Sequence, residues 1–242
     1  MKILALDSSG IVASVAVVED DTLLAEYTVN YKKTHSQTLL PMLDEIVKMT
    51  ELDLESIDAI AVAAGPGSFT GLRIGSATAK GLGLALKKPL VAVPTVDALA
   101  YNLYDAQGVI CPIMDARRKQ VYTGIYRFEE HQLVTLKEQW AAPIEELLEE
   151  LNHRGEMVTF LGDGVPVFRD LIAEKLPVPY SFAPAHVNKQ RAAAVAALGS
   201  IYYKEGRTET AIEHVPEYLR VSQAERERAE REKVQKQAGA EI

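Results

Sequence analysis

The same order of predicted elements occurs twice along the 242 residues of the chain. In the first half, residues 2–30 predict three strands separated by turn-forming residues, and the apolar positions of residues 35–50 recur on one face of a helix. A buried strand over 57–64 then leads through a glycine loop into a helix over 69–86. One more strand and one more helix complete this unit.

The order then restarts. Residues 109–139 predict three strands, residues 143–154 predict a helix, and residues 157–176 predict another strand, glycine loop and helix before a last alanine-rich helix. The loop LGDGV has the place that AGPGS has in the first half. Hairpins and crossover connections together require mixed sheets. The sequence therefore predicts a duplicated α/β protein whose two βββαβαβα halves, residues 1–106 and 107–221, face each other across a cleft.

Composition limits the classes of function. With 34 acidic and 26 basic residues the net charge is −8, so repulsion by phosphates makes nucleic-acid binding by the chain alone unfavourable. The single cysteine, Cys111, cannot form a disulfide within the chain, and its apolar neighbours indicate a buried core residue. No apolar run approaches the roughly 18 residues of a membrane span, and none resembles a signal peptide. We expect a soluble, cytoplasmic protein without a membrane partner.

The last 21 residues, 222–242, differ from the rest of the chain. Ten of them are charged and almost none is apolar, so they cannot bury enough surface to fold alone. We expect a frayed, solvated helix or a disordered tail, with a linker or docking segment as the alternative.

The glycine loop GPGSFTGLRIG, residues 65–75, could bind phosphate or permit close packing. It lacks the Lys-Ser or Lys-Thr pair of a P-loop, and no acidic residue stands about 20 positions later, where a dinucleotide-binding motif needs one. A nicotinamide dehydrogenase is therefore a weak alternative. Four small residues instead recur at every fourth position and form one slanted ridge of a helix: Gly71, Gly75, Ala79 and Gly83. Such a ridge favours close approach of another backbone, from within the chain or from a second chain.

Two polar turns follow strands that would end at the cleft. Asp7, Ser8 and Ser9 form the first turn, which could bind a nucleotide phosphate or simply build a hairpin. Asp115 ends the corresponding strand of the second half and has the same two interpretations. The basic run ARRK at residues 116–119 fits a solvated hairpin tip, with an anion or RNA contact as the alternative.

Metal-dependent and serine-hydrolase chemistry have no support in the sequence. None of the five histidines has a second histidine four positions later, and H-E-x-x-H is absent. No G-x-S-x-G motif marks a nucleophile elbow. We therefore predict neither a catalytic residue nor a metal ligand.

The chain contains the segments ILALDSS, AVAAGPGSFTGLRIGSATAKGLGLAL, MDARRKQVY and PEYLR. Together these resemble the bacterial TsaB family of tRNA threonylcarbamoyladenosine biosynthesis proteins over about residues 1–221, and GPGSFTGLRIG is the most specific part. The resemblance implies a duplicated actin-like, ribonuclease H-like fold of the superfamily that includes sugar kinases and chaperone ATPases.

The resemblance also implies a role. TsaB-like proteins are non-catalytic partners of the paralogue TsaD, which transfers a threonylcarbamoyl group to adenosine 37 of tRNAs that read codons beginning with A, and the P-loop ATPase TsaE joins them. TsaD holds its metal with H-x-x-x-H, and by resemblance Thr95 and Leu99 occupy those positions here. This departure favours a pseudo-enzyme that requires no cofactor and meets tRNA only through the complex. ATP or ADP with magnesium could still bind at the cleft or at the junction with the partner.

In this family, two helices of the N-terminal half pair with the equivalent helices of the partner, or of a second copy in a homodimer. By resemblance these helices are residues 36–49 and 69–86. The small-residue ridge and the leucines beside it then become the predicted partner interface: Leu39, Leu43, Gly71, Leu72, Gly75, Ala79 and Gly83.

An active small-molecule kinase or ATPase of the same fold is the main alternative function. It would need carboxylates for magnesium and for a general base, and Asp7 and Asp115 could serve. Hydrolysis of MgATP by the chain alone, lost in Asp7→Ala, would favour this alternative.

Overall fold

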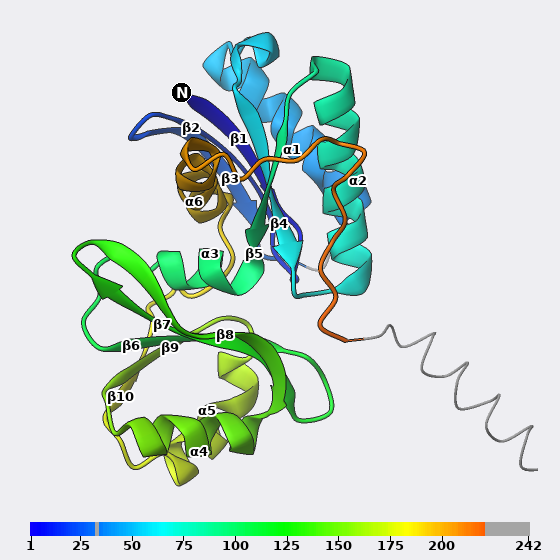
Figure 1. The fold of residues 1–242 in the computed structure, drawn as a ribbon. Coiled ribbons are helices and arrows are strands. Elements are labelled where there is room, and N and C mark those ends of the chain that lie inside the picture. The colour runs from blue at the N-terminus through cyan, green and yellow to red at the C-terminus, as the bar shows by residue number, and fades with distance from the viewer. Residues whose placement is uncertain (32–33, 221–242) are drawn as a thin grey trace, which may run out of the picture.

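The computed structural model describes residues 1–31 and 34–220, so the predicted tail over 222–242 lies outside the described residues. The chain builds two five-stranded sheets, the first half above the second in Figure 1. Each half has the element order βββαβαβα, which confirms the predicted duplication. No helix of the described ranges is long and apolar enough to cross a membrane.

The two sheets share one strand order. The first sheet runs β3 (Thr22–Val29), β2 (Ala13–Glu19), β1 (Lys2–Asp7), β4 (Ala59–Gly65) and β5 (Leu90–Pro94). The second sheet runs β8 (Gln132–Pro143), β7 (Gln120–Glu129), β6 (Val109–Asp115), β9 (Val158–Leu161) and β10 (Tyr180–Phe182). The first three strands of each half pair antiparallel and the later strands pair parallel. The sequence pattern missed β10, because a strand of three residues gives no periodic signal.

Helices cover both faces of the first sheet. The α-helices of the described residues are α1 (His35–Thr50), α2 (Phe69–Leu86), α3 (Thr95–Tyr101), α4 (Ile144–Arg154), α5 (Val165–Lys175) and α6 (Ala192–Lys204). Leu4 and Leu6 of β1 pack toward α1 and α2, whereas Ile3 and Ala5 pack toward α6. Because successive side chains point to opposite faces, a strand buried on both sides needs an unbroken apolar run, and ILAL supplies it.

The two halves exchange their last helices. α6 comes last in the second half, but its Val195 belongs to the core of the first sheet. α3 comes last in the first half, but its Leu99 shares a core with Ile110 of the second sheet. The predicted halves, residues 1–106 and 107–221, therefore each place their last helix on the sheet of the other.

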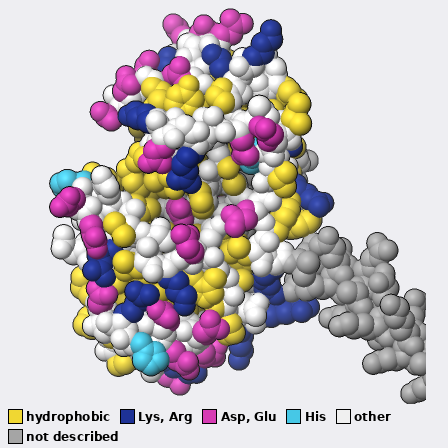
Figure 2. All heavy atoms as spheres, viewed as in Figure 1, with side chains coloured by type: hydrophobic (Ala, Val, Ile, Leu, Met, Phe, Trp, Pro, Cys, Tyr) yellow, Lys and Arg dark blue, Asp and Glu magenta, His cyan; other side chains and the backbone are white. Residues whose placement is uncertain are grey.

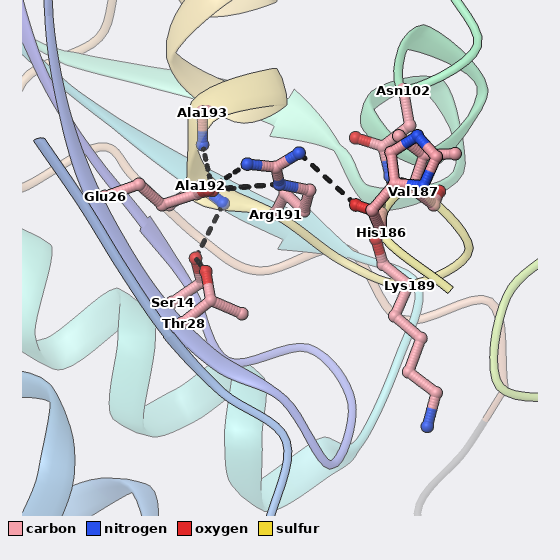
Figure 3. Close-up of polar contacts among 10 residues, drawn as sticks. All are labelled: Ser14, Glu26, Thr28, Asn102, His186, Val187, Lys189, Arg191, Ala192 and Ala193. Carbon is pink, nitrogen blue, oxygen red and sulfur yellow. Dashed lines mark hydrogen bonds and ion pairs between the residues drawn. The ribbon is translucent and has the colours of Figure 1, made fainter. Parts of the chain in front are cut away.

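The chain crosses between the halves twice, and the two crossings lie side by side (Figure 3). Asn102, just after α3, donates from its side-chain amide to the carbonyl oxygens of Val187 (3.1 Å) and Lys189 (2.7 Å), just before α6. These bonds join the two connections at the point where the helices are exchanged.

The first sheet supplies the acceptors for the N-terminus of α6. No side chain of its own caps this helix. Instead, the backbone N–H of Ala192 donates to Ser14 Oγ (2.9 Å) and that of Ala193 donates to Glu26 Oε1 (3.1 Å). Glu26 also forms an ion pair with Arg191. One carboxylate on β3 thus satisfies a helix terminus and a cation together, which fixes α6 on the sheet.

The small-residue ridge of α2 faces the chain's own sheet. All of its members and the leucines assigned with them are buried within the chain: Leu39, Leu43, Gly71, Leu72, Gly75, Ala79 and Gly83. A Cβ at Gly71 would lie 2.1 Å from the carbonyl oxygen of Ser8, and a Cβ at Gly75 would lie 2.5 Å from Ser8 Oγ. The prediction that these seven residues form the partner interface is therefore wrong. They let α2 approach the turn between β1 and β2.

Gly71→Ala and Gly81→Ala are a matched pair on α2 that tests this packing. A Cβ at Gly81 would meet nothing within 4 Å, so Gly81→Ala should raise the free energy of unfolding by about 1 kcal/mol through helix propensity. Gly71→Ala should lower it by roughly 2 kcal/mol, because the new carbon overlaps backbone atoms. Urea unfolding followed by circular dichroism measures both values, and equal effects would contradict the packing described.

Candidate functional site

A cleft of about 550 Å³ opens between the two halves, where β1 and β6 end. One wall consists of the β1–β2 turn and the N-terminus of α2, and the other consists of the β6–β7 turn and the loop before α5. Charged and aromatic side chains line it: Phe69, Asp115, Arg117, Tyr122, Asp163, Glu217, Tyr218 and Arg220. The duplicated topology therefore brings the two predicted polar turns to one place.

The polar turn after β1 uses its side chains inside the protein. Ser8 Oγ donates to the carbonyl oxygen of Gly71 (2.8 Å). Ser9 donates to Asp7 Oδ1 from its N–H (2.9 Å) and from its Oγ (2.7 Å). Asp7, Ser8 and Ser9 are each at most 3 % exposed. The side chains of the turn are therefore engaged within the protein, although Ser9 and Gly10 contribute to the cleft lining. Binding of a nucleotide phosphate by this turn stays a prediction.

Buried carboxyl groups lie beneath and beside the cleft. Burial raises the pKa of Asp7 to about 6 and also raises the pKa of Asp163. Asp163 Oδ1 accepts a hydrogen bond from the N–H of Asp115 (3.2 Å), which ties the loop before α5 to β6. Asp115 itself lines the cleft as predicted, and its Oδ1 accepts from the N–H of Arg117 (2.9 Å).

The positions aligned by resemblance with the TsaD histidines lie in the interior. Thr95 Oγ1 accepts from the N–H of Gly65 (3.2 Å), and Leu99 is part of a hydrophobic core. Within residues 1–31 and 34–220, no three His, Cys, Asp or Glu side chains gather into a group that could hold a metal ion. Since the β1–β2 turn also lacks free side-chain donors, the described residues fit a magnesium nucleotide poorly.

A segment that the sequence did not assign to any element forms one edge of the cleft. Residues 209–220, here called the C-terminal strap, run back beside α2 toward the cleft (orange in Figure 1). Glu209 exchanges backbone hydrogen bonds with Leu90 of β5 (2.8 and 3.0 Å). Lys80 of α2 donates to the carbonyl oxygen of His214 (2.8 Å).

The strap touches both halves where it reaches the cleft. The ring of Tyr218 stacks on Phe69 of α2 with centroids 4.5 Å apart. Arg220 Nη1 donates to the carbonyl oxygen of Ala116 in the β6–β7 turn (2.5 Å). The strap therefore links α2, one of the two helices that the resemblance assigns to partner contact, to the second wall of the cleft.

The chain is similar to known proteins over most of its length. Residues 22–228 match the family TsaD, tRNA N6-adenosine threonylcarbamoyltransferase. The tRNA threonylcarbamoyladenosine biosynthesis protein TsaB of Bacillus subtilis (strain 168) is 34% identical over 225 residues, or 93% of this chain and 96% of the relative. TsaB of Escherichia coli (strain K12) is 32% identical over 225 residues, or 91% and 95%. The structure of YeaZ from Pseudomonas aeruginosa superposes with a TM-score of 0.74 at 24% identity, over 90% of this chain and 99% of that one.

Two sheets of identical order around a cleft define the class of this protein, a duplicated actin-like fold. A second Pseudomonas aeruginosa structure, described as similar to peptidase YeaZ, shares this fold with a TM-score of 0.76 at 26% identity, over 90% of this chain and 99% of that one. Within this class, the chain belongs to the TsaB family.

Asp7→Asn tests the buried carboxyl. The folded protein keeps a proton on Asp7 up to a pKa of about 6, whereas the unfolded carboxyl releases it near 3.8. The free energy of unfolding should therefore fall by about 2–3 kcal/mol as the pH rises through this window. Asparagine keeps the Oδ1 acceptor without a charge, so the variant should match the wild type at about pH 4 and exceed its stability by about 2 kcal/mol above pH 7. Urea unfolding across this range measures the difference, and parallel pH profiles would contradict it.

Tyr218→Ala tests the strap. Loss of the stack on Phe69 removes about 1 kcal/mol of local interaction, so amide hydrogens of residues 217–220 should exchange about five-fold faster. Tyr104→Ala is the matched control, because Tyr104 is also exposed and stacks on a phenylalanine, Phe128, away from the strap. Hydrogen–deuterium exchange read by mass spectrometry should show faster strap exchange in Tyr218→Ala alone.

Proposed function

We propose that the chain is a non-catalytic subunit of the machinery for tRNA threonylcarbamoyladenosine biosynthesis. In this role it binds and supports a TsaD-like catalytic paralogue that modifies adenosine 37, together with a TsaE-like P-loop ATPase, and it forms a homodimer when alone. Similarity to TsaB relatives over more than nine-tenths of the chain supports the pathway. The role requires no cofactor in this chain, and tRNA is met within the complex.

The observation that carries the partner role is a set of exposed small and apolar residues on the two N-terminal helices, four of which lie along one side of α2. Small and apolar residues of α1 and α2 are open to solvent: Leu40, Met49, Ala77, Gly81, Leu84 and Ala85. Met49 is 83 % exposed, Leu84 62 % and Leu40 54 %. Leu40 and Met49 are nine residues apart and so lie on opposite sides of α1. We therefore call the four residues of α2, Ala77, Gly81, Leu84 and Ala85, the partner face. It replaces the buried ridge as the predicted interface.

The geometry of α2 suits contact with another helix. Ala77, Gly81 and Leu84 follow at steps of four and three residues, so they share one side of the helix. A Cβ at Gly81 would meet nothing in the described chain. A helix of a second chain could therefore lie close to the α2 backbone at this point, as small residues permit.

The cleft gives less support to the alternative of a small-molecule kinase or ATPase. Asp7 would have to meet magnesium or act as a base, but it is buried and accepts hydrogen bonds from Ser9. Thr95 and Leu99 offer no metal ligand to the cleft. Asp115 alone of the predicted carboxylates lines the cleft. ATP or ADP with magnesium at the partner junction stays a prediction.

Ala77→Arg tests the partner face. A long charged side chain at an exposed helical alanine should leave the fold intact but prevent another helix from approaching, which should weaken pairing at least about 100-fold, as a hot-spot loss of roughly 3 kcal/mol does. Ala173→Arg is the matched control, because Ala173 is an exposed alanine of α5 in the other half. Light-scattering chromatography, with the chain alone and mixed with its TsaD-like paralogue, should show pairing by the wild type and the control only. Normal pairing by Ala77→Arg would overturn the proposed interface.

A further inference from the structure

The hairpin tip between β6 and β7 carries three consecutive cations that the partner role does not use. Arg117, Arg118 and Lys119 are all exposed. Their φ angles are 66°, 56° and 58°, so three successive non-glycine residues have left-handed backbone conformation. Each such residue costs roughly 1 kcal/mol, and such conformations persist only where the surroundings hold them.

Hydrogen bonds on both sides hold this tip in place. The N–H of Ala116 donates to the carbonyl oxygen of Gln120 (2.9 Å), and the N–H of Gln120 donates to the carbonyl oxygen of Arg117 (3.1 Å). The N–H of Ile144, at the start of α4, donates to the carbonyl oxygen of Lys119 (3.1 Å). The three side chains therefore project from a fixed backbone rather than from a loose loop.

The tip is one part of a basic rim around the cleft mouth. Arg220 of the strap bonds the tip at Ala116, and Arg73 of α2 lies over the ring of Phe69 at 4.0 Å. The guanidinium of Arg73 also reaches the hydroxyl of Tyr218, the strap residue beside Arg220 (3.4 Å). We call the five cations the basic rim: Arg73, Arg117, Arg118, Lys119 and Arg220. In Figure 2, Lys and Arg side chains gather beside the point where the described residues end.

Asp115, Asp163 and Glu217 line the same cleft, but among the described residues Arg117 alone of the rim cations forms an ion pair with a carboxylate. Arg117 pairs with Asp115 at 3.7 Å, but its side chain is 86 % exposed, so this contact is weak. Among the described residues, no carboxylate lies within ion-pair distance of Arg118 or Lys119. Such a local concentration of positive charge stands out on a chain whose net charge is −8. Attraction of a polyanion can therefore act here although the chain as a whole repels one.

We propose that the basic rim contacts the phosphate backbone of the tRNA held by the assembled complex. The inference rests on the proposed function and adds the surface through which this subunit meets the RNA. Arg73 lies four residues before Ala77 on α2, so the rim adjoins the partner face. The proposal requires that a tRNA bound by the paralogue passes within reach of the rim. Phosphate contacts of this kind position a nucleic acid without reading its sequence.

The arrangement suits a polymer of phosphates better than a single free anion. A free phosphate needs donors that converge on one point, whereas these cations sit on three elements: the tip, the strap and α2. Arginine and lysine side chains on a rigid support can each meet a different phosphate of a backbone. Cations on three elements around one cleft mouth can thus meet successive phosphates of a backbone.

The test uses the complex of the full chain with its TsaD-like paralogue and an unmodified tRNA transcript that reads a codon beginning with A. Fluorescence anisotropy gives the binding constant between about 50 and 200 mM salt. For the double variant Arg118→Gln/Lys119→Gln we expect binding several-fold weaker at the lower salt. The slope of log K against log salt should become shallower by about 1.5, since each lost phosphate contact removes about 0.7–0.9.

Lys87→Gln/Lys88→Gln is the matched control. It removes the same charge, and Lys87 also has a left-handed backbone (φ 54°), but the pair lies past the far end of the 18-residue helix α2. The control should keep the wild-type slope, and thermal melts should show all three proteins folded. An unchanged slope in the tip variant, or equal loss in both variants, overturns the inference.

Two further outcomes separate the sources of a failure. If the wild-type chain does not join the paralogue, the proposed function fails rather than the tRNA contact. Inorganic phosphate is the second probe. If the tip variant changes binding of inorganic phosphate to the chain but not the tRNA slope, the rim is a site for free anions and the proposed RNA contact is wrong.

Discussion

The exchange of α3 and α6 between the two sheets is the constraint on which the rest of the structure depends. Each sheet has one face covered by a helix from the other half, so neither half has a complete core of its own. The exchanged helices also meet: Asp97 of α3 accepts hydrogen bonds from the hydroxyls of Tyr202 on α6 (3.2 Å) and Tyr126 on β7 (2.7 Å). Burial raises the pKa of Asp97, and the two hydroxyls oppose that rise by stabilising its charged form.

This exchange also determines where the cleft lies and how it is held. The polar crossing around Asn102 and Arg191 joins the halves beside the exchanged helices, and the strap joins them again at the cleft mouth through Arg220. Contacts within this chain thus hold the two walls of the cleft together on two sides.

The sequence predicted the helices and strands that local periodicity defines. It did not predict which way a helix face points, or which residues far apart in the chain come into contact. The repeat and both N-terminal helices, 35–50 and 69–86, agree with the structure. Periodicity placed the ridge residues on one side of α2 but could not say what that side faces, and both sides of this helix carry small residues. The strap was missed because Tyr218 and Phe69 are far apart in sequence. The left-handed tip was not predicted either, because residues 117–119 include no Gly or Asn, the residue types that usually adopt this conformation.

Glycine on the two sides of α2 has different physical consequences. Each glycine in a helix costs about 1 kcal/mol relative to alanine. At Gly71 and Gly75 the fold itself requires the missing side chain, because the β1–β2 turn occupies that space, and the packing of turn against helix offsets the cost. At Gly81 nothing in the described chain occupies the space, so nothing within it offsets the cost. A residue that weakens its own helix without improving its own packing agrees with the partner contact proposed for this side of α2.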